Sequence, residues 1–340
     1  MGSQITPIIK KQVLNLEDLR GKSFAVDAYN ILHQFLALIR TREGKPLTDK
    51  DGNITSHLVG LAYRTTRLIS EFDMKLVFIF DGKPPLLKYD EVEKRRNIRK
   101  KAEKEYFSAI EKGDLKTAYS KAVMTGKLTE QGILDAKKLL DLLGIPWIQA
   151  PSEGEAQAAH LTIREDVWAV NSRDYDSLLF GSPRLVRYLT ISGEEWLPSK
   201  RKARKLFPEL IELSQNLRYL EISREQLIDL AILIGTDFNK GLKGIGPKTA
   251  LKLIKIHKTL ENLPKDIQKR IPENYQIVRD IYLTPSVTNE YDLLPGKLHE
   301  DGLYSFLCQE REFSKKRVEL LIKRIKQSQS QRNITDFFRR

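Results

Sequence analysis

The chain has 340 residues, of which 41% are apolar and 30% are charged, and its formal net charge is +13; this composition fits a globular protein of one large or two intertwined domains, and the excess of Lys and Arg favours a polyanionic partner. No apolar run approaches the ~18 residues of a membrane-spanning helix, so no such helix is expected. The single cysteine, Cys308, excludes a disulfide framework and a thiolate metal cluster and favours an intracellular location.

Two short apolar runs near the N-terminus, residues 23–26 and 75–80, are predicted to be buried strands. Asp27 directly follows the first run, and Asp81 directly follows the second. The intervening chain has helical spacing, so the β-α-β order predicts a mostly parallel sheet. The carboxyl ends of parallel strands meet at one edge, where we expect both aspartates to lie.

Residues 88–104 form a charged stretch that contains eight Lys or Arg and four acidic residues. Its apolar residues are too sparse for a core helix. One interpretation is a solvated helical face. The other, favoured by the position directly after the Asp81 motif, is a mobile basic cover over an acidic pocket.

The middle of the chain continues this α/β pattern. A helix is predicted over 129–143, ending at Gly144, and short buried strands are predicted over 146–149, 167–170 and 185–189. Further acidic residues follow these elements, so the same crevice is expected to receive them.

Ser152 and Glu155 have the spacing of a capping box, which predicts that Glu153 and Glu155 lie in the first turn of a helix. The simpler interpretation is that both glutamates only complement the helix dipole. Any one Asp at a strand end is likewise weak evidence of a site, because short acidic motifs are common in surface turns.

Taken together, seven carboxylates are expected to converge on one crevice: Asp27, Asp81, Glu153, Glu155, Asp174, Asp176 and Asp237. So many negative charges require cations to offset their repulsion. Oxygen ligands favour Mg²⁺, and two such ions can support the hydrolysis of a phosphodiester. An acidic pocket on a basic protein therefore predicts a nuclease.

A glycine-rich stretch, residues 241–250, lies between predicted helices at 227–234 and 249–257, of which the first is expected to be buried. Ser223 and Gln226 have capping-box spacing before that helix. The pattern predicts a helix-hairpin-helix that holds a DNA phosphate through turn amides, although an ordinary helix connection remains the alternative. The expected contributors are Gly244, Gly246, Lys248 and Lys252.

The last residues, 327–340, are polar apart from Ile334, Phe337 and Phe338, and are predicted to be disordered on their own. A single helical turn would bring these three apolar side chains together as a plug for a pocket of a partner. The alternative is that the two phenylalanines fold back onto the body of the protein.

Together these residues resemble the flap endonuclease family, the structure-specific 5′ nucleases of replication and repair, over nearly the whole chain. The matching motifs occur in family order: 55–58 (TSHL), 80–85 (FDGKPP), 150–156 (APSEGEA), 180–183 (FGSP) and 244–248 (GIGPK). The resemblance implies an α/β fold of the PIN-like 5′-nuclease type. This fold has a mostly parallel central sheet flanked by helices, a helical arch, and a helix-hairpin-helix of the H2TH type.

The resemblance also implies a role for each site residue. One Mg²⁺ would bind Asp27, Asp81, Glu153 and Glu155, and the second would bind Asp174, Asp176 and Asp237, with Mn²⁺ as a possible substitute. Lys88 and Arg95 would act on the scissile phosphate from the arch. Arg40, Arg64 and Gly235 match positions that touch DNA. The tail peptide with Gln331, Ile334, Phe337 and Phe338 resembles the peptide that binds the sliding clamp (PCNA), and the compact chain resembles archaeal members.

Two departures from the family pattern are visible. His33 stands where eukaryotic members have a tyrosine for base stacking, and the acidic segment that lines a 3′-flap pocket in relatives is here Asp49-Lys50-Asp51-Gly52. We expect weaker or partly charged stacking at His33. The lower acidity of this segment does not favour a preference for a one-nucleotide 3′ flap.

The expected regions are an N-terminal nuclease region at 1–99, a basic helical arch or cover at 84–128, an internal nuclease region at 117–262 that contains the helix-hairpin-helix at 223–262, a packing region at 263–326, and a disordered tail at 327–340 with a clamp-binding peptide at 331–338.

The predicted function is 5′-flap endonuclease with 5′–3′ exonuclease activity, in a monomer that joins a clamp complex in the cytoplasm or nucleoid of an archaeon. A related bubble- or junction-cutting nuclease is the closest alternative. A non-catalytic architectural protein bound to the clamp is the second alternative, which the full set of seven acids disfavours.

Overall fold

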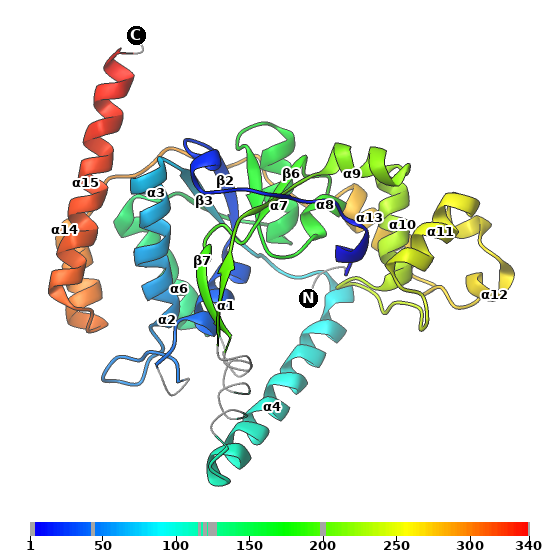
Figure 1. The fold of residues 1–340 in the computed structure, drawn as a ribbon, viewed down its shortest axis with the longest axis horizontal. Helices are drawn as coiled ribbons and strands as arrows, with labels where there is room; N and C mark the ends of the chain where they lie inside the picture. The colour runs from blue at the N-terminus through cyan, green and yellow to red at the C-terminus, as the bar shows by residue number, and fades with distance from the viewer. Residues whose placement is uncertain are drawn as a thin grey trace.

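The computed structural model describes residues 4–41, 45–114, 117, 121, 128–197 and 202–338. A seven-stranded sheet in the order β1-β9-β6-β5-β2-β3-β4 forms its centre (Figure 1). The strands are β1 (Gln12–Val13), β2 (Ser23–Asp27), β3 (Lys75–Phe80), β4 (Trp147–Gln149), β5 (Ala169–Asn171), β6 (Arg184–Arg187) and β9 (Glu209–Glu212). The five strands from β4 to β6 are parallel, and β9 and β1 add antiparallel pairs at one edge. The predicted mostly parallel sheet is confirmed.

Alternation along β2 shows how the sheet is buried on both faces. Phe24 and Val26 pack into one apolar core, whereas Ala25 between them packs into the other. Because both faces are covered, the central strands read as continuous apolar runs in the sequence. Outside the sheet, β7 (Gly193–Leu197) and β8 (Lys202–Leu206) form a separate antiparallel hairpin.

Helices cover each face of the sheet (Figure 1). The core that includes Phe24 contains residues of α1 (Ala28–Leu38), α2 (Ser56–Gly60), α3 (Thr66–Phe72), α6 (Glu130–Leu143), α14 (Glu300–Leu303) and α15 (Lys315–Phe338). The opposite core contains residues of α7 (Gly154–Ile163), α8 (Asp176–Leu179), α9 (Leu213–Leu220), α10 (Arg224–Ile234), α11 (Pro247–His257) and α13 (Tyr275–Leu283), with α12 (Lys265–Gln268) beside it. None of the described helices is long and apolar enough to cross a membrane.

The basic segment forms α4 (Tyr89–Glu111), preceded by a single 3₁₀ turn at Leu86–Lys88. This helix extends away from the body of the molecule, as the cyan helix in Figure 1 shows. The helix begins shortly after β3 and Asp81. Its role as one side of an arch stays a prediction. Part of the predicted arch region, 84–128, lies outside the described residues.

The two predicted capping boxes have different outcomes. The box at the start of α10 is confirmed. The Ser223 hydroxyl accepts a hydrogen bond from the Gln226 backbone amide, and the Gln226 side-chain oxygen accepts one from the Ser223 backbone amide. The box predicted for Ser152 and Glu155 is wrong, because α7 begins at Gly154 with Glu153 as its N-cap and without a side-chain cap. The carboxylate of Glu153 instead bonds Lys88, and that of Glu155 lies against Ser172.

The predicted disorder of the tail is not what the structure shows. The backbone of α15 continues as helix to Phe338, through most of the segment 327–340. The first turns of α15 pack into the core through Val318, Leu321 and Ile322, which nucleates the helix. Extension of an existing helix costs far less than nucleation, so a polar continuation can remain helical.

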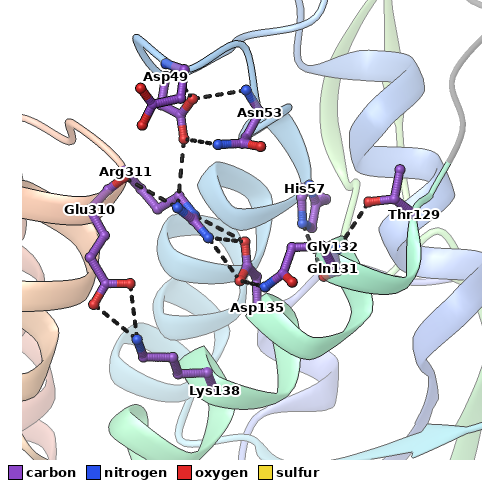
Figure 2. A network of polar contacts seen from close by, with 11 residues as sticks. Asp49, Asn53, His57, Thr129, Gln131, Gly132, Asp135, Lys138, Glu310 and Arg311 are labelled. Atoms are coloured by element: carbon purple, nitrogen blue, oxygen red, sulfur yellow. Dashed lines mark hydrogen bonds and ion pairs between the residues drawn. The ribbon is translucent and has the colours of Figure 1, made fainter.

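A buried ionic network ties the C-terminal region to the body (Figure 2). The Arg311 guanidinium bonds the Asp135 carboxylate of α6 at 2.9 and 3.0 Å and lies 3.7 Å from Asp49. Asp49 also accepts hydrogen bonds from Asn53. One carboxylate of the expected 3′-flap segment, Asp49, is therefore engaged in structural contacts.

Candidate active site

The seven predicted carboxylates are brought together at one edge of the sheet. Asp27 ends β2, Asp81 follows β3, and Asp174 follows β5, and these three strands are neighbours in the sheet. Glu153 and Glu155 lie at the start of α7, Asp176 starts α8, and Asp237 lies in the loop after α10. Electrostatic interactions connect all seven, for example Asp27 with Asp81 and Asp174.

Two carboxylates are fixed by backbone amides. The Asp27 side chain caps α1 and accepts a 3.0 Å hydrogen bond from the Asn30 amide. Asp81 accepts a 2.7 Å hydrogen bond from the Gly154 amide, so this carboxylate lies at the positively polarised N-terminus of α7. A Cβ atom at position 154 would lie 2.6 Å from Asp81 Oδ1, so glycine is needed for this approach.

Two polar residues that the sequence did not single out join the carboxylates. The Asn30 side-chain amide donates a 2.8 Å bond to Asp174, while its backbone bonds Asp27. The Ser172 hydroxyl lies 3.0 Å from Asp27 and 3.1 Å from Glu155, and its single proton can serve only one of them at a time. Their closeness in sequence to Asp27 and Asp174 was the only signal available.

Two cations from the basic segment reach into this site. Lys88 Nζ bonds the Glu153 carboxylate and lies 3.8 Å from Asp237. Arg95 binds both oxygens of Asp237, at 2.7 and 2.8 Å. The predicted placement of Lys88 and Arg95 over the acidic pocket is thus seen in the structure, and both side chains converge on Asp237.

The charge compensation is uneven across the site. Burial, together with the charges of Asp81 and Asp174, raises the pKa of Asp27 to about 8. Burial and the charge of Asp176 also raise the pKa of Glu155 well above its usual range. Burial opposes ionisation of Asp237 too, but the charges of Arg95 and Lys88 lower its pKa overall.

This donor set fits divalent cations. Buried carboxylates with raised pKa values, such as Asp27 and Glu155, are stabilised in their charged form by a nearby metal ion. The donors are all oxygens, which Mg²⁺ and Mn²⁺ prefer. In the described part of the chain, no three Asp, Glu, His or Cys side chains are already arranged to hold a single ion. Glu153 and Asp237 are engaged by Lys88 and Arg95 in this arrangement.

The helix-hairpin-helix prediction matches α10, α11 and the loop between them. Gly235 ends α10 with a φ of 101°, and a Cβ there would lie 2.7 Å from the Gly241 amide nitrogen. Gly244 also has a positive φ, 87°. Gly246 does not: it is the N-cap of α11 and has a φ of −96°. Lys248 and Lys252 are exposed on α11.

The other predicted DNA contacts lie elsewhere on the molecule. Arg40 pairs with Pro46 in a short bridge after α1, and Arg64 lies in the π-helical turn between α2 and α3. His33 is exposed on α1, within electrostatic reach of Arg95 and Arg99 of α4. The structure therefore does not gather all predicted DNA contacts at one place. The side chains of the predicted clamp peptide, 331–338, lie outside the described residues.

Comparisons with known proteins agree with this geometry. The family model of the XPG N-terminal domain matches residues 2–102, and that of the XPG I-region matches residues 144–237. Flap endonuclease 1 of Staphylothermus marinus is 48% identical over 331 residues, which cover 96% of this chain and 94% of that protein.

Solved structures show the same similarity. The flap endonuclease-1 structure from Methanococcus jannaschii has 38% identity and a TM-score of 0.77, and the match covers 97% of this chain and all of that one. The catalytic core of Rad2 in complex with a DNA substrate has 23% identity and a TM-score of 0.68, covering 94% and 97% of the two chains, which shows a shared fold.

Proposed function

Since this chain belongs to the flap endonuclease family, a group of structure-specific DNA nucleases, we propose that it cuts 5′-flap DNA with two divalent metal ions held by the seven carboxylates. The observation that carries this proposal is the convergence of buried carboxylates and two cations at one edge of the sheet. A role in DNA replication and repair is consistent with the family.

The resemblance to the family suggests how the seven carboxylates would be shared between the two ions. Asp27, Asp81, Glu153 and Glu155 would hold one ion, and Asp174, Asp176 and Asp237 would hold the other. Ions held there activate a water molecule and neutralise the leaving oxygen in phosphodiester hydrolysis. Mg²⁺ is the proposed ion, with Mn²⁺ as a substitute.

Lys88 and Arg95 serve the phosphate rather than the metals. If Glu153 and Asp237 turned to hold ions, the Lys88 ammonium and the Arg95 guanidinium would become available to the substrate. They would then bond the non-bridging oxygens of the scissile phosphate and stabilise the negative charge of the transition state. Without substrate, the same cations offset the negative charges of Glu153 and Asp237.

The loop between α10 and α11 would hold the duplex part of the substrate. Its exposed amides and the lysines Lys248 and Lys252 offer contacts to a phosphate, and they carry no base-sequence information. Asp237 lies in the same loop region, so a bound duplex is placed beside the metal site.

Gly244→Val is expected to weaken binding to plain duplex DNA by about tenfold, since valine does not easily adopt positive φ and the amides would move. Fluorescence anisotropy with labelled duplex and single strand measures this effect. Gly21→Val is the matched control, because Gly21 has a φ of 72°, an open Cβ position and no place in this loop. Equal losses in both variants, or a loss confined to single strand, would place the duplex contact elsewhere.

Arg64 is proposed as a second phosphate contact. It lines a cavity of about 220 Å³ together with Arg67 and Thr190. A guanidinium group is suited to binding a phosphate oxygen.

The C-terminal peptide 331–338 is proposed to bind a sliding clamp through Gln331, Ile334, Phe337 and Phe338. Deleting residues 331–340, or changing both phenylalanines to Ala, should remove clamp binding while leaving cleavage of free flap DNA unchanged. Burying two Phe and one Ile contributes roughly 5 kcal/mol before ordering costs, so the peptide on its own is expected to bind no more tightly than about 0.2 mM. Calorimetry with purified clamp measures it. Undiminished binding by the double variant would move the contact to the folded body.

The specific function is tested by metal-dependent cleavage of four labelled substrates: a 5′ flap, a single strand, a bubble and a four-way junction. The proposed flap endonuclease cuts the flap fastest, near the junction of single and double strand. Fastest cleavage of the bubble or junction would favour the related branched-DNA nuclease. Tight binding without any cleavage would favour the architectural role.

A further inference from the structure

Tyr282 of α13 lies directly behind the second group of carboxylates. Its side chain is fully buried, and its ring packs on Phe180 at 4.8 Å and on Phe238 at 5.5 Å between centroids. Phe238 is the residue after Asp237. Phe180 follows the last residue of α8, and its amide bonds the Asp176 carbonyl. The ring is therefore wedged between the backbone segments that carry Asp176 and Asp237.

The hydroxyl group of Tyr282 has no hydrogen-bond partner among the described residues. Its nearest polar neighbour is the Thr236 side chain, which is close but does not meet the geometry of a hydrogen bond to it, and the charges of Asp176 and Asp237 also act on it. Thr236 donates its own proton to Asn239. A fully buried donor without an acceptor is uncommon in folded proteins, and it requires a physical explanation.

We propose that Tyr282 is a positioning residue of the metal site, whose hydroxyl donates a hydrogen bond to the Asp176 carboxylate when that carboxylate turns to hold its ion. The inference rests on the proposed two-ion site. Metal-binding carboxylates are commonly oriented by a hydrogen bond from outside the ligand set. Burial and the charge of Asp176 raise the pKa of Tyr282 well above its usual range, so the proton remains available for donation.

Asp176 is the favoured acceptor for a structural reason. It is buried, and it begins α8, whose end is packed against the Tyr282 ring through Phe180. Of the two carboxylates that act on the Tyr282 hydroxyl, Asp176 does so more strongly than Asp237. A rigid ring wedged behind the helix would restrict the Asp176 carboxylate to orientations that face the cation.

The test is a thermal-unfolding titration with Mg²⁺ and with Mn²⁺ on the full chain. Tyr282→Phe removes only the hydroxyl, and Tyr63→Phe is its matched control. The Tyr63 hydroxyl is also buried without a hydrogen-bond partner among the described residues, but its ring stacks on Phe313, away from the carboxylates. Both variants should unfold without metal at or above the temperature of the unmodified protein, since each loses an unpaired buried donor.

With metal, only Tyr282→Phe should change. We expect its midpoint metal concentration for stabilisation to rise about tenfold, the size of effect typical for such supporting hydrogen bonds, with no change in Tyr63→Phe. In an Asp176→Asn background, Tyr282→Phe should cause no further loss. A midpoint equal to that of the unmodified protein would overturn the role of Tyr282 alone. No metal-induced stabilisation in the unmodified protein would overturn the two-ion site and this role together.

Discussion

Asp81→Ala and Asp176→Ala are each expected to abolish cleavage of a 5′ flap while leaving flap binding nearly intact. Asp81 is held by the Gly154 amide at the start of α7, and Asp176 starts α8, so each stands for one of the two proposed ions. Loss of one ligand should cost several kcal/mol of transition-state stabilisation, which is a rate loss of about 10³-fold or more. DNA is held by basic residues, which these substitutions leave in place.

Single-turnover cleavage and anisotropy on the same flap separate chemistry from binding. Asp166→Ala is a suitable control, since Asp166 bonds Arg164 and Tyr291 at the surface and takes no part in the acidic site. Its rate should stay within twofold of the unmodified protein, a change of about 0.4 kcal/mol. Near-normal turnover by Asp176→Ala in Mg²⁺ would show that the second ion is not held as proposed.

Lys88→Ala and Arg95→Ala should slow the chemical step much more than they weaken affinity for the flap. Both side chains now contact the carboxylates that would hold metal ions, and both are expected to turn to the scissile phosphate. Removal of a donor to a developing charge costs about 10²- to 10³-fold in rate. Because Lys88 also competes with a cation for Glu153, metal-induced stabilisation of Lys88→Ala should not fall.

Lys101 lies on α4, the helix that carries Arg95 and directly follows Lys88, and it provides the matched control. Its side chain is 80% exposed and its contact with Glu105, at 4.0 Å, is a surface ion pair. Lys101→Ala should cause only a small, salt-dependent loss of binding. Equal effects of Lys88→Ala and Lys101→Ala on single-turnover rates would mean that α4 acts as a charged surface alone.

The central strands could be predicted from the sequence because their apolar runs and the polar residues that follow them indicate the same boundaries. The runs that became β2 and β3 are apolar and end next to Asp27 and Asp81, so both strand and site could be read from one pattern. The antiparallel strands β1 and β9 were not predicted, since they are short and carry polar residues. Their pairing depends on contact between distant segments, which no local pattern encodes.

The errors in prediction have local physical causes. Ser152 and Glu155 have capping spacing, but the start of α7 is determined by the approach of Gly154 to Asp81. Gly244 and Gly246 look equivalent in sequence, yet only Gly244 takes positive φ. Backbone dihedral angles at neighbouring glycines depend on how the loop closes in space.

Some members of the site could not be identified from residue types at all. Asn30 and Ser172 are ordinary polar residues, and they become part of the site only because β2 and β5 are adjacent in the sheet. Tyr282 is distant in sequence from every carboxylate, and its ring comes near the segments that carry Asp176 and Asp237 only through contact with Phe180 and Phe238.

The central claim, that seven carboxylates hold two ions, is tested most directly by counting the ions. Mn²⁺ is titrated into the full chain bound to a flap oligonucleotide whose scissile linkage resists cleavage, and bound Mn²⁺ is quantified by electron paramagnetic resonance. Two Mn²⁺ ions per chain are expected, with the magnetic coupling of a pair about 4 Å apart, and a single Mn²⁺ ion is expected in Asp176→Ala. A single uncoupled ion in the unmodified protein would contradict it.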